Sequence, residues 1–198
     1  MGDEISKETL ASTAEALLQG TSKLSIAAGL EDTFSSMFSM HTERGAILNA
    51  AALVDEILAD VIQGYMIRSS LKQQMFKPGR AFGDFGVRIG LAYLLGIISK
   101  STYQELEVVR EIRNRFAHDH KVANFSHTAV AAQAAKFEII PALKSVDISK
   151  DSFLAGIFNK FDLDQPRFVY LATCIFLVAV LLVEGQDGAP LRSPRAEL

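Results

Sequence analysis

The fold is decided by "STYQELEVVREIRNRFAHDH", residues 101–120, where apolar and polar side chains alternate with the period of an α-helix. Its apolar positions recur at steps of three and four residues and therefore share one face: Leu106, Val109, Ile112 and Phe116. Ser101 and Gln104 have the spacing of a capping box, so we expect the helix to begin there. Because an apolar stripe of this kind has to be covered, the segment predicts packing against further helices.

The same period extends on both sides of this segment, and strand patterns are scarce. Further helices are predicted over residues 3–18, 42–67, 84–98 and 126–138, and from residue 166 onward. Pro141 is expected to break the helical pattern, and residues 76–83 form a turn-rich connector. The sequence therefore predicts an all-α fold, a single helical bundle of about six or seven helices over residues 1–185. Residues 186–198 lack an apolar period and are expected to form a disordered tail.

The most apolar segment, "FVYLATCIFLVAVLLV" at residues 168–183, raises the question of a membrane span. It is shorter than the roughly 20 residues that a spanning helix needs. A helix that is apolar all round also suits the centre of a bundle, so we predict a buried core helix and no membrane association. The single cysteine, Cys174, and an acidic, polar start without the pattern of a secretory signal favour a reducing, cytoplasmic setting.

The polar side of residues 101–120 carries a group of side chains suited to phosphodiester chemistry. Asn114 and His118 are four residues apart and share a helix face, Arg113 lies at its edge, and Arg110 extends the row. A histidine can transfer a proton at neutral pH, and an arginine can hold phosphate oxygens. The alternative is an ordinary solvated helix end, where a histidine is favoured by the backbone dipole. Spacing alone leaves both interpretations open.

Charge and motif content narrow the classes of function. The net charge of −3 gives no overall basic field for nucleic acid. The most basic stretch lies between residues 68 and 88, where a single acidic residue, Asp84, opposes Arg68, Lys72, Lys77, Arg80 and Arg88. No helix-turn-helix pair is recognisable, so a DNA-reading helix is not expected. His120 and His127 lack the cysteine and carboxylate partners of a metal site, and no phosphate-binding glycine loop is present, so neither metal nor cofactor is predicted.

The segment "RNRFAH", residues 113–118, resembles the arginine-to-histidine motif of the HEPN superfamily, which often places an asparagine directly after the arginine. The resemblance implies a helical bundle that dimerises by bringing the motif from two chains together. Many such domains are metal-independent ribonucleases, and others are non-catalytic regulators. In a ribonuclease, His118 would be the acid and base, Arg113 would hold the phosphate, and Asn114 would position the 2′-hydroxyl or the histidine.

A longer resemblance, over residues 82–120, is to the mannitol operon repressor family. It rests on Gly83-Asp84 before a helix, Arg88 one turn on, the Leu-Gly-Ile-Ile helix end, the Tyr-Gln-Glu-Leu entry and the Arg113-to-His118-Asp119 pattern. The segment "LNAAALVDEIL", residues 48–58, is similar to the preceding helix of that family. Asn114 and Ala117 are closer to the HEPN ribonucleases, and residues 142–165 match neither family.

These resemblances imply a cytoplasmic, dimeric transcriptional regulator that works through a protein partner, with RNA or DNA as further candidate partners. The residues expected on its functional surface are Asp84, Arg88, Arg110 and Asp119. Asp84 and Arg88 are four residues apart, so they would form a surface ion pair or help to orient His118. The alternative function is a metal-independent, toxin-like endoribonuclease that uses Arg113, Asn114 and His118.

Overall fold

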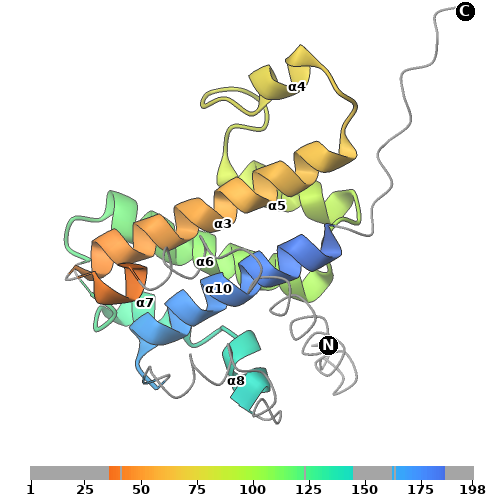
Figure 1. Ribbon diagram of the computed structural model, residues 1–198. Coiled ribbons are helices and arrows are strands. Elements are labelled where there is room, and N and C mark those ends of the chain that lie inside the picture. Colours follow the sequence, from red (N-terminus) through yellow and green to blue (C-terminus); the bar gives the residue numbers. More distant parts are fainter. Residues whose placement is uncertain (1–35, 41, 123, 145–161, 163, 186–198) are drawn as a thin grey trace, which may run out of the picture.

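The computed structural model describes residues 36–40, 42–122, 124–144, 162 and 164–185, and the regular elements in these ranges are all helices (Figure 1). After a short helical segment at residues 36–39, they are in chain order α3 (Glu43–Tyr65), α4 (Ser70–Met75), α5 (Phe85–Leu94), α6 (Lys100–His118), α7 (Thr128–Ala134), α8 (Ile139–Lys144) and α10 (Pro166–Glu184). The predicted all-α bundle is confirmed. The helix expected over residues 3–18, most of residues 142–165 and the tail lie outside the described residues.

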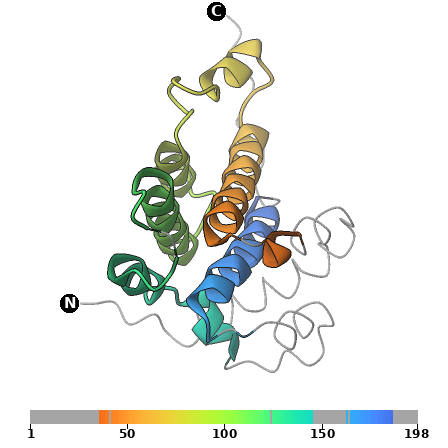
Figure 2. The same ribbon diagram turned by 90° about the vertical axis from the view of Figure 1, so that its left-hand side faces the viewer.

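Helix α10 forms the centre of the bundle. It lies beside α3, and α6 packs against both of them (Figures 1 and 2). Every residue from Tyr170 to Leu181 is buried. By length and composition α10 could cross a membrane, but 67% of its most apolar window is buried within the protein, as in a core helix. The predicted buried core helix is confirmed.

The apolar stripe predicted on α6 faces this centre. Leu106, Val109, Ile112 and Phe116 are all completely buried. Tyr170 of α10 ties the three long helices together, because its hydroxyl lies 3.5 Å from the carbonyl oxygens of both Ile47 and Val109. A buried hydroxyl needs such partners, so this one side chain fixes how α3 and α6 sit on α10.

Helix α6 begins earlier than the capping-box spacing predicted. Its N-cap is Ser99, whose hydroxyl accepts a hydrogen bond from the backbone N–H of Thr102 at 3.2 Å. The prediction that Ser101 begins the helix is therefore wrong by two residues. An N-cap serine accepts a hydrogen bond from the backbone N–H three residues later, and from the sequence alone either Ser99 or Ser101 could do so.

Two further boundaries also differ from the prediction. Helix α5 ends at Leu94 rather than at residue 98, because Gly96 adopts a φ of 69°, the left-handed conformation that closes many helices. Pro141 does not break the pattern but lies in the first turn of α8. Proline is tolerated there because the backbone N–H of a first-turn residue has no partner within the helix.

Candidate functional site

The predicted motif residues lie in the last two turns of α6, and the structure brings two of the three together. Arg113 Nη1 donates to Asn114 Oδ1 at 2.9 Å, and both side chains are half-buried. His118 is exposed, and among the described residues no hydrogen bond joins it to either of them. Within the described part of one chain, a general acid is therefore not placed beside the arginine that would bind phosphate.

The end of α6 is held instead by Arg44, from the first turn of α3. Its guanidinium donates to the carbonyl oxygens of Phe116, of Asp119 at 3.1 Å and of Val122 at 2.8 Å. A helix C-terminus exposes unpaired carbonyls and a partial negative charge, and an arginine satisfies both. The sequence analysis missed Arg44, because no local pattern links it to a helix more than 70 residues away.

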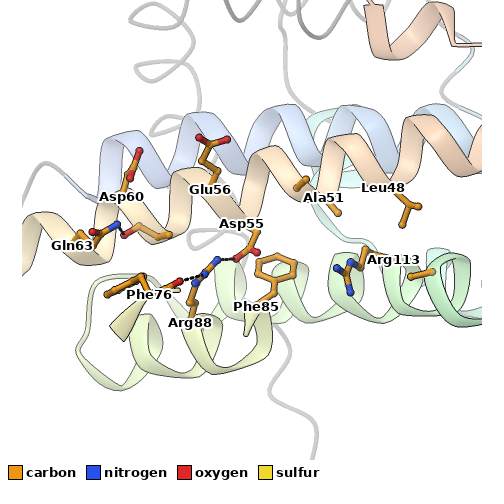
Figure 3. Close-up of a pocket in the computed structure, with 13 residues that line it drawn as sticks. Leu48, Ala51, Asp55, Glu56, Asp60, Gln63, Phe76, Phe85, Arg88 and Arg113 are labelled. Atoms are coloured by element: carbon orange, nitrogen blue, oxygen red, sulfur yellow. Dashed lines mark hydrogen bonds and ion pairs between the residues drawn. The ribbon is translucent and has the colours of Figure 1, made fainter. Parts of the chain in front are cut away.

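Arg113 faces a pocket of about 510 Å³ between α3, α5 and α6 (Figure 3). The lining residues include Leu48, Ala51, Asp55, Phe85, Arg88, Arg113 and Ala117. At one end of the pocket, Arg88 Nη1 of α5 forms an ion pair with Asp55 Oδ1 of α3 at 2.6 Å. Arg113 of α6 lies toward the other end, on the far side of the Phe85 ring (Figure 3). Burial raises the pKa of the Asp55 carboxyl, while the hydrogen bond and charge of Arg88 and the charge of Arg113 act to lower it.

Asp84 and Arg88 do not pair with each other in the described part of the chain. Asp84 is the N-cap of α5, and its Oδ1 accepts the backbone N–H groups of Gly86 at 2.8 Å and Val87 at 3.3 Å. Arg88 reaches Asp55 on α3 instead. The predicted Asp84–Arg88 ion pair is therefore wrong, because the aspartate oxygen is engaged at the helix start. Neither residue contacts His118 among the described hydrogen bonds.

Arg110 and Asp119 also have local partners. Arg110 Nη2 lies 2.7 Å from Glu107 Oε2 and 3.0 Å from Glu111 Oε1, and the hydrogen bond to Glu107 is the largest cause of its raised pKa. Asp119 is the C-cap of α6, and its Oδ1 accepts the backbone N–H of Lys121 at 2.9 Å. Arg110 is thus bound to two carboxylates rather than extending the row of Arg113 and His118.

A second hollow, an acidic groove of about 530 Å³, runs along α6 toward the start of α8. Carboxylates dominate its ionisable lining, which comprises Glu105, Glu107, Glu111, Lys136 and Glu138. Glu105 is buried, and its Oε1 accepts the backbone N–H groups of Glu138 at 2.6 Å and Ile139 at 3.2 Å. Burial raises the pKa of Glu105 to about 7, against the effect of these two hydrogen bonds.

Beside this groove, α5 presents apolar side chains to solvent. Val87 is 45% exposed, Leu94 83% and Leu95 45%. Leu94 and Leu95 follow Val87 by seven and eight residues, which is two helical turns, so the three side chains lie on the same side of the helix. We call these three residues the α5 face. Tyr93 connects it to the groove, because its ring stacks on that of groove residue Tyr103 with centroids 4.8 Å apart. Hydrophobic periodicity marked α5 as a helix but gave no signal that this side is uncovered.

No cluster of three or more histidine, cysteine or acidic side chains suited to a metal ion occurs among the residues that the structure describes. The described surface instead carries ion pairs, exposed apolar side chains and a carboxylate-lined groove.

The family model described as "Mannitol repressor" matches residues 34–169, which include every described helix from α3 to α8. The expectation that residues 142–165 match neither family is therefore wrong, because this model extends over them. The chain belongs to the mannitol repressor family. A similar solved structure is the X-ray structure of the MtlR–HPr complex from Escherichia coli, with 18% sequence identity and a TM-score of 0.56. The match covers 76% of this chain and 96% of the Escherichia coli chain. It shows that this member of the mannitol repressor family has a similar fold. No curated protein sequence matches the chain.

Proposed function

We propose that this chain is a transcriptional regulator of the mannitol repressor family that acts by binding a protein partner of the HPr kind. The family match over residues 34–169 is the observation that carries the proposal. The similar fold from Escherichia coli was determined as a complex with HPr, which supports a protein as the partner here. A cytoplasmic setting, where such a regulator would meet its partner, belongs to the same proposal.

The α5 face and the acidic groove supply a surface of the right chemistry for such a partner. Leu94 is the most exposed large apolar side chain in the described part of the chain, and it costs free energy to leave it in water. Contiguous exposed apolar residues with a polar rim are typical of protein-binding surfaces. Glu107 and Glu111 line the adjoining groove and share the single positive charge of Arg110, so one negative charge is left there. The complementary partner surface is therefore apolar with a basic edge.

Dimerisation through the end of α6 completes the proposal. His118 is exposed, and among the described residues Arg113 has no ion pair, so both are available to a second copy. In this arrangement the two copies of Arg113, Asn114 and His118 face each other across a two-fold axis.

The ribonuclease alternative has no comparable support. The described geometry leaves Arg113 and His118 without a mutual contact, and the family match is to a repressor. Cleavage of RNA by the wild-type chain is the outcome that would contradict the proposal in favour of this alternative.

Titration calorimetry with purified HPr from the same cell tests the proposal. Leu94→Asp should weaken binding by about 10-fold or more, because a charge enters an apolar contact. Leu71→Asp is the matched control, since Leu71 on α4 is also an exposed leucine, at 60%, but lies off the α5 face. Wild-type chain that takes up no HPr would contradict the proposal, and equal loss in both variants would contradict the α5 face as its surface.

A further inference from the structure

Glu105 lines the acidic groove and has one carboxylate oxygen to spare. The residue is only 4% exposed, and its Oε1 already accepts the backbone N–H groups of Glu138 and Ile139 at the start of α8. Its Oε2 is buried and has no hydrogen-bond partner among the described residues. A buried carboxylate oxygen without a partner is costly, so Oε2 is an acceptor that a bound ligand can satisfy.

The charge of the groove selects a positively charged ligand. Its lining contains four carboxylates and one amine, those of Glu105, Glu107, Glu111, Glu138 and Lys136. Arg110 adds a second positive charge through its ion pairs with two of the carboxylates. When Glu105 is ionised, four negative and two positive charges leave a net charge of −2. Such a lining attracts a cation and repels an anion.

A basic side chain fits this groove better than a metal ion does. Calcium and magnesium need several oxygen ligands around one point, and the described residues contain no cluster of three or more suited to a metal. The head of an arginine or lysine instead donates several N–H groups and can reach one carboxylate oxygen. Its apolar stem can lie along the half-buried ring of Tyr103, which also lines the groove and stacks on Tyr93 beside the α5 face.

The protonation state of Glu105 decides whether the groove offers its full charge. Burial raises the pKa of Glu105 to about 7, and the charge of Glu138 raises it too, against the two backbone N–H donors. Helix α10 packs on both α6 and α8, and its titratable groups between residues 170 and 181 are Tyr170 and Cys174. Burial raises the pKa of both, so neither is charged at neutral pH. A cation in the groove would favour the ionised form of Glu105 and lower its pKa.

We propose that the acidic groove binds an arginine or lysine side chain of the protein partner against the Glu105 carboxylate, and that this pairing releases a proton from Glu105. The inference rests on the proposed function and deepens it, because it names the partner group that enters the groove and the condition for its entry. The proton passes from the carboxyl to the buffer, and the partner's cation then neutralises the charge. Glu105 therefore makes partner binding depend on pH near neutrality.

Titration calorimetry of the full chain with HPr, in two buffers of different ionisation enthalpy, measures the protons released on binding. About half of the Glu105 carboxyls are protonated at pH 7 in the free chain, so binding should release about half a proton there. Affinity should rise about 10-fold from about pH 6 to about pH 8 and level off above that. Binding of HPr without proton release, or with an affinity that stays flat or falls over this range, would overturn the inference.

Glu105→Gln separates Glu105 from the other titrating groups of both proteins, because glutamine keeps an acceptor for the two N–H groups at the start of α8. This variant should bind HPr about 10-fold more weakly at pH 8 and release almost no proton at pH 7. Glu111→Gln is the matched control, since it removes one carboxylate of the same groove whose side chain is 41% exposed. It should weaken binding but keep the proton release. Equal loss of proton release in both variants would overturn the assignment to Glu105.

A small ligand, N-acetyl-arginine amide, tests the groove without HPr. At pH 8 it should shift the backbone N–H signals of Glu138 and Ile139 in NMR spectra, because both groups donate to Glu105. The shifts should be much smaller at pH 6 and in Glu105→Gln. N-acetyl-glutamine amide at the same ionic strength, which lacks the charge, should leave both signals in place.

The two experiments distinguish failure of this inference from failure of the proposed function. If HPr does not bind, the proposed function is contradicted and the small ligand decides the inference alone. Shifts then support the groove as a site for a basic side chain, and no shift at concentrations up to about 100 mM overturns it. If HPr binds without releasing a proton, the inference falls and the proposed function stands.

Discussion

Arg88 of α5 and Asp55 of α3 are joined across the bundle by an ion pair of 2.6 Å, with the two side chains only 11% and 27% exposed. The same guanidinium donates to the carbonyl oxygens of Phe76 and Phe82. One arginine therefore connects α3, α5 and the segment from Phe76 to Phe82 that joins them. This connection explains why an arginine one turn into α5 is structurally important without being part of a catalytic group.

Replacing Arg88 should destabilise the fold substantially. Arg88→Met leaves Asp55 and the backbone carbonyls of Phe76, Phe82 and Gly83 without this donor. Breaking a largely buried pair typically costs about 3–5 kcal/mol. Urea denaturation of Arg88→Met, Asp55→Asn and the double variant measures the coupling between the two residues. A coupling energy near zero would show that the pair adds nothing to the packing of α3 on α5.

Removing Arg44 should weaken the end of α6. Arg44→Gln deprives the carbonyls of Phe116, Asp119 and Val122 of charged donors, and we expect a loss of about 2 kcal/mol in the free energy of unfolding. Arg115→Gln, at an exposed position on the same helix, should change stability by less than about 0.5 kcal/mol. Equal effects of the two variants would contradict the capping role of Arg44.

The pH dependence of stability should report the buried Glu105. Its pKa rises from 4.5 in the unfolded chain to about 7 in the fold, so the folded state binds more protons between these values. Stability should therefore be highest below about pH 4.5, fall as pH rises toward about 7, and be level above that. The full contribution is about 3 kcal/mol.

Glu105→Gln isolates this contribution, because glutamine keeps an oxygen for the N–H groups of Glu138 and Ile139 but does not titrate. Burial also raises the pKa values of Asp55 and Glu184, so the difference between wild type and variant is the informative quantity. Urea denaturation across this pH range should show a shallower pH dependence in the variant. If the wild type and the variant instead show the same dependence of stability on pH, Glu105 is ionised in the folded chain over this range, which would contradict its raised pKa.

The features that sequence could predict are those set by local periodicity. The stripe from Leu106 to Phe116 and the apolar run around Tyr170 each need burial, and no tertiary knowledge is required to infer that. Both were found in the core. Motif spacing likewise located the Arg113–His118 segment at the end of a helix.

Tertiary partners could not be predicted in the same way. The four-residue spacing of Asp84 and Arg88 suggested an ion pair, but the N–H groups at the start of α5 bind the aspartate, and Asp55 on another helix binds the arginine. Arg44 gave no sequence signal because its partners are backbone carbonyls, which every residue possesses. The exposure of Leu94 depends on what α5 packs against, and its own periodicity is the same whether or not that side is covered.

Dimerisation gives a prediction that concerns the end of α6. Light scattering of the purified chain in dilute buffer should give the mass of a dimer. Arg113→Glu should shift the mass toward that of a monomer, because a negative charge from each copy would then face the other across the interface and repel it. Lys100→Glu, at an exposed position at the start of the same helix, makes the same change of charge and serves as the control. A monomer mass for the wild type at tens of micromolar would contradict the proposed assembly.

The most direct test of the central claim measures RNA synthesis and RNA ends in cells whose chromosomal copy carries Leu94→Asp, Leu71→Asp or His118→Ala. A regulator that acts through a protein partner predicts that Leu94→Asp changes transcription initiation at a discrete operon, that Leu71→Asp does not, and that RNA ends are the same in all strains. The contradicting result is unchanged initiation in every strain together with RNA ends bearing 2′,3′-cyclic phosphates that disappear in His118→Ala, because that pattern is the product of a metal-independent ribonuclease.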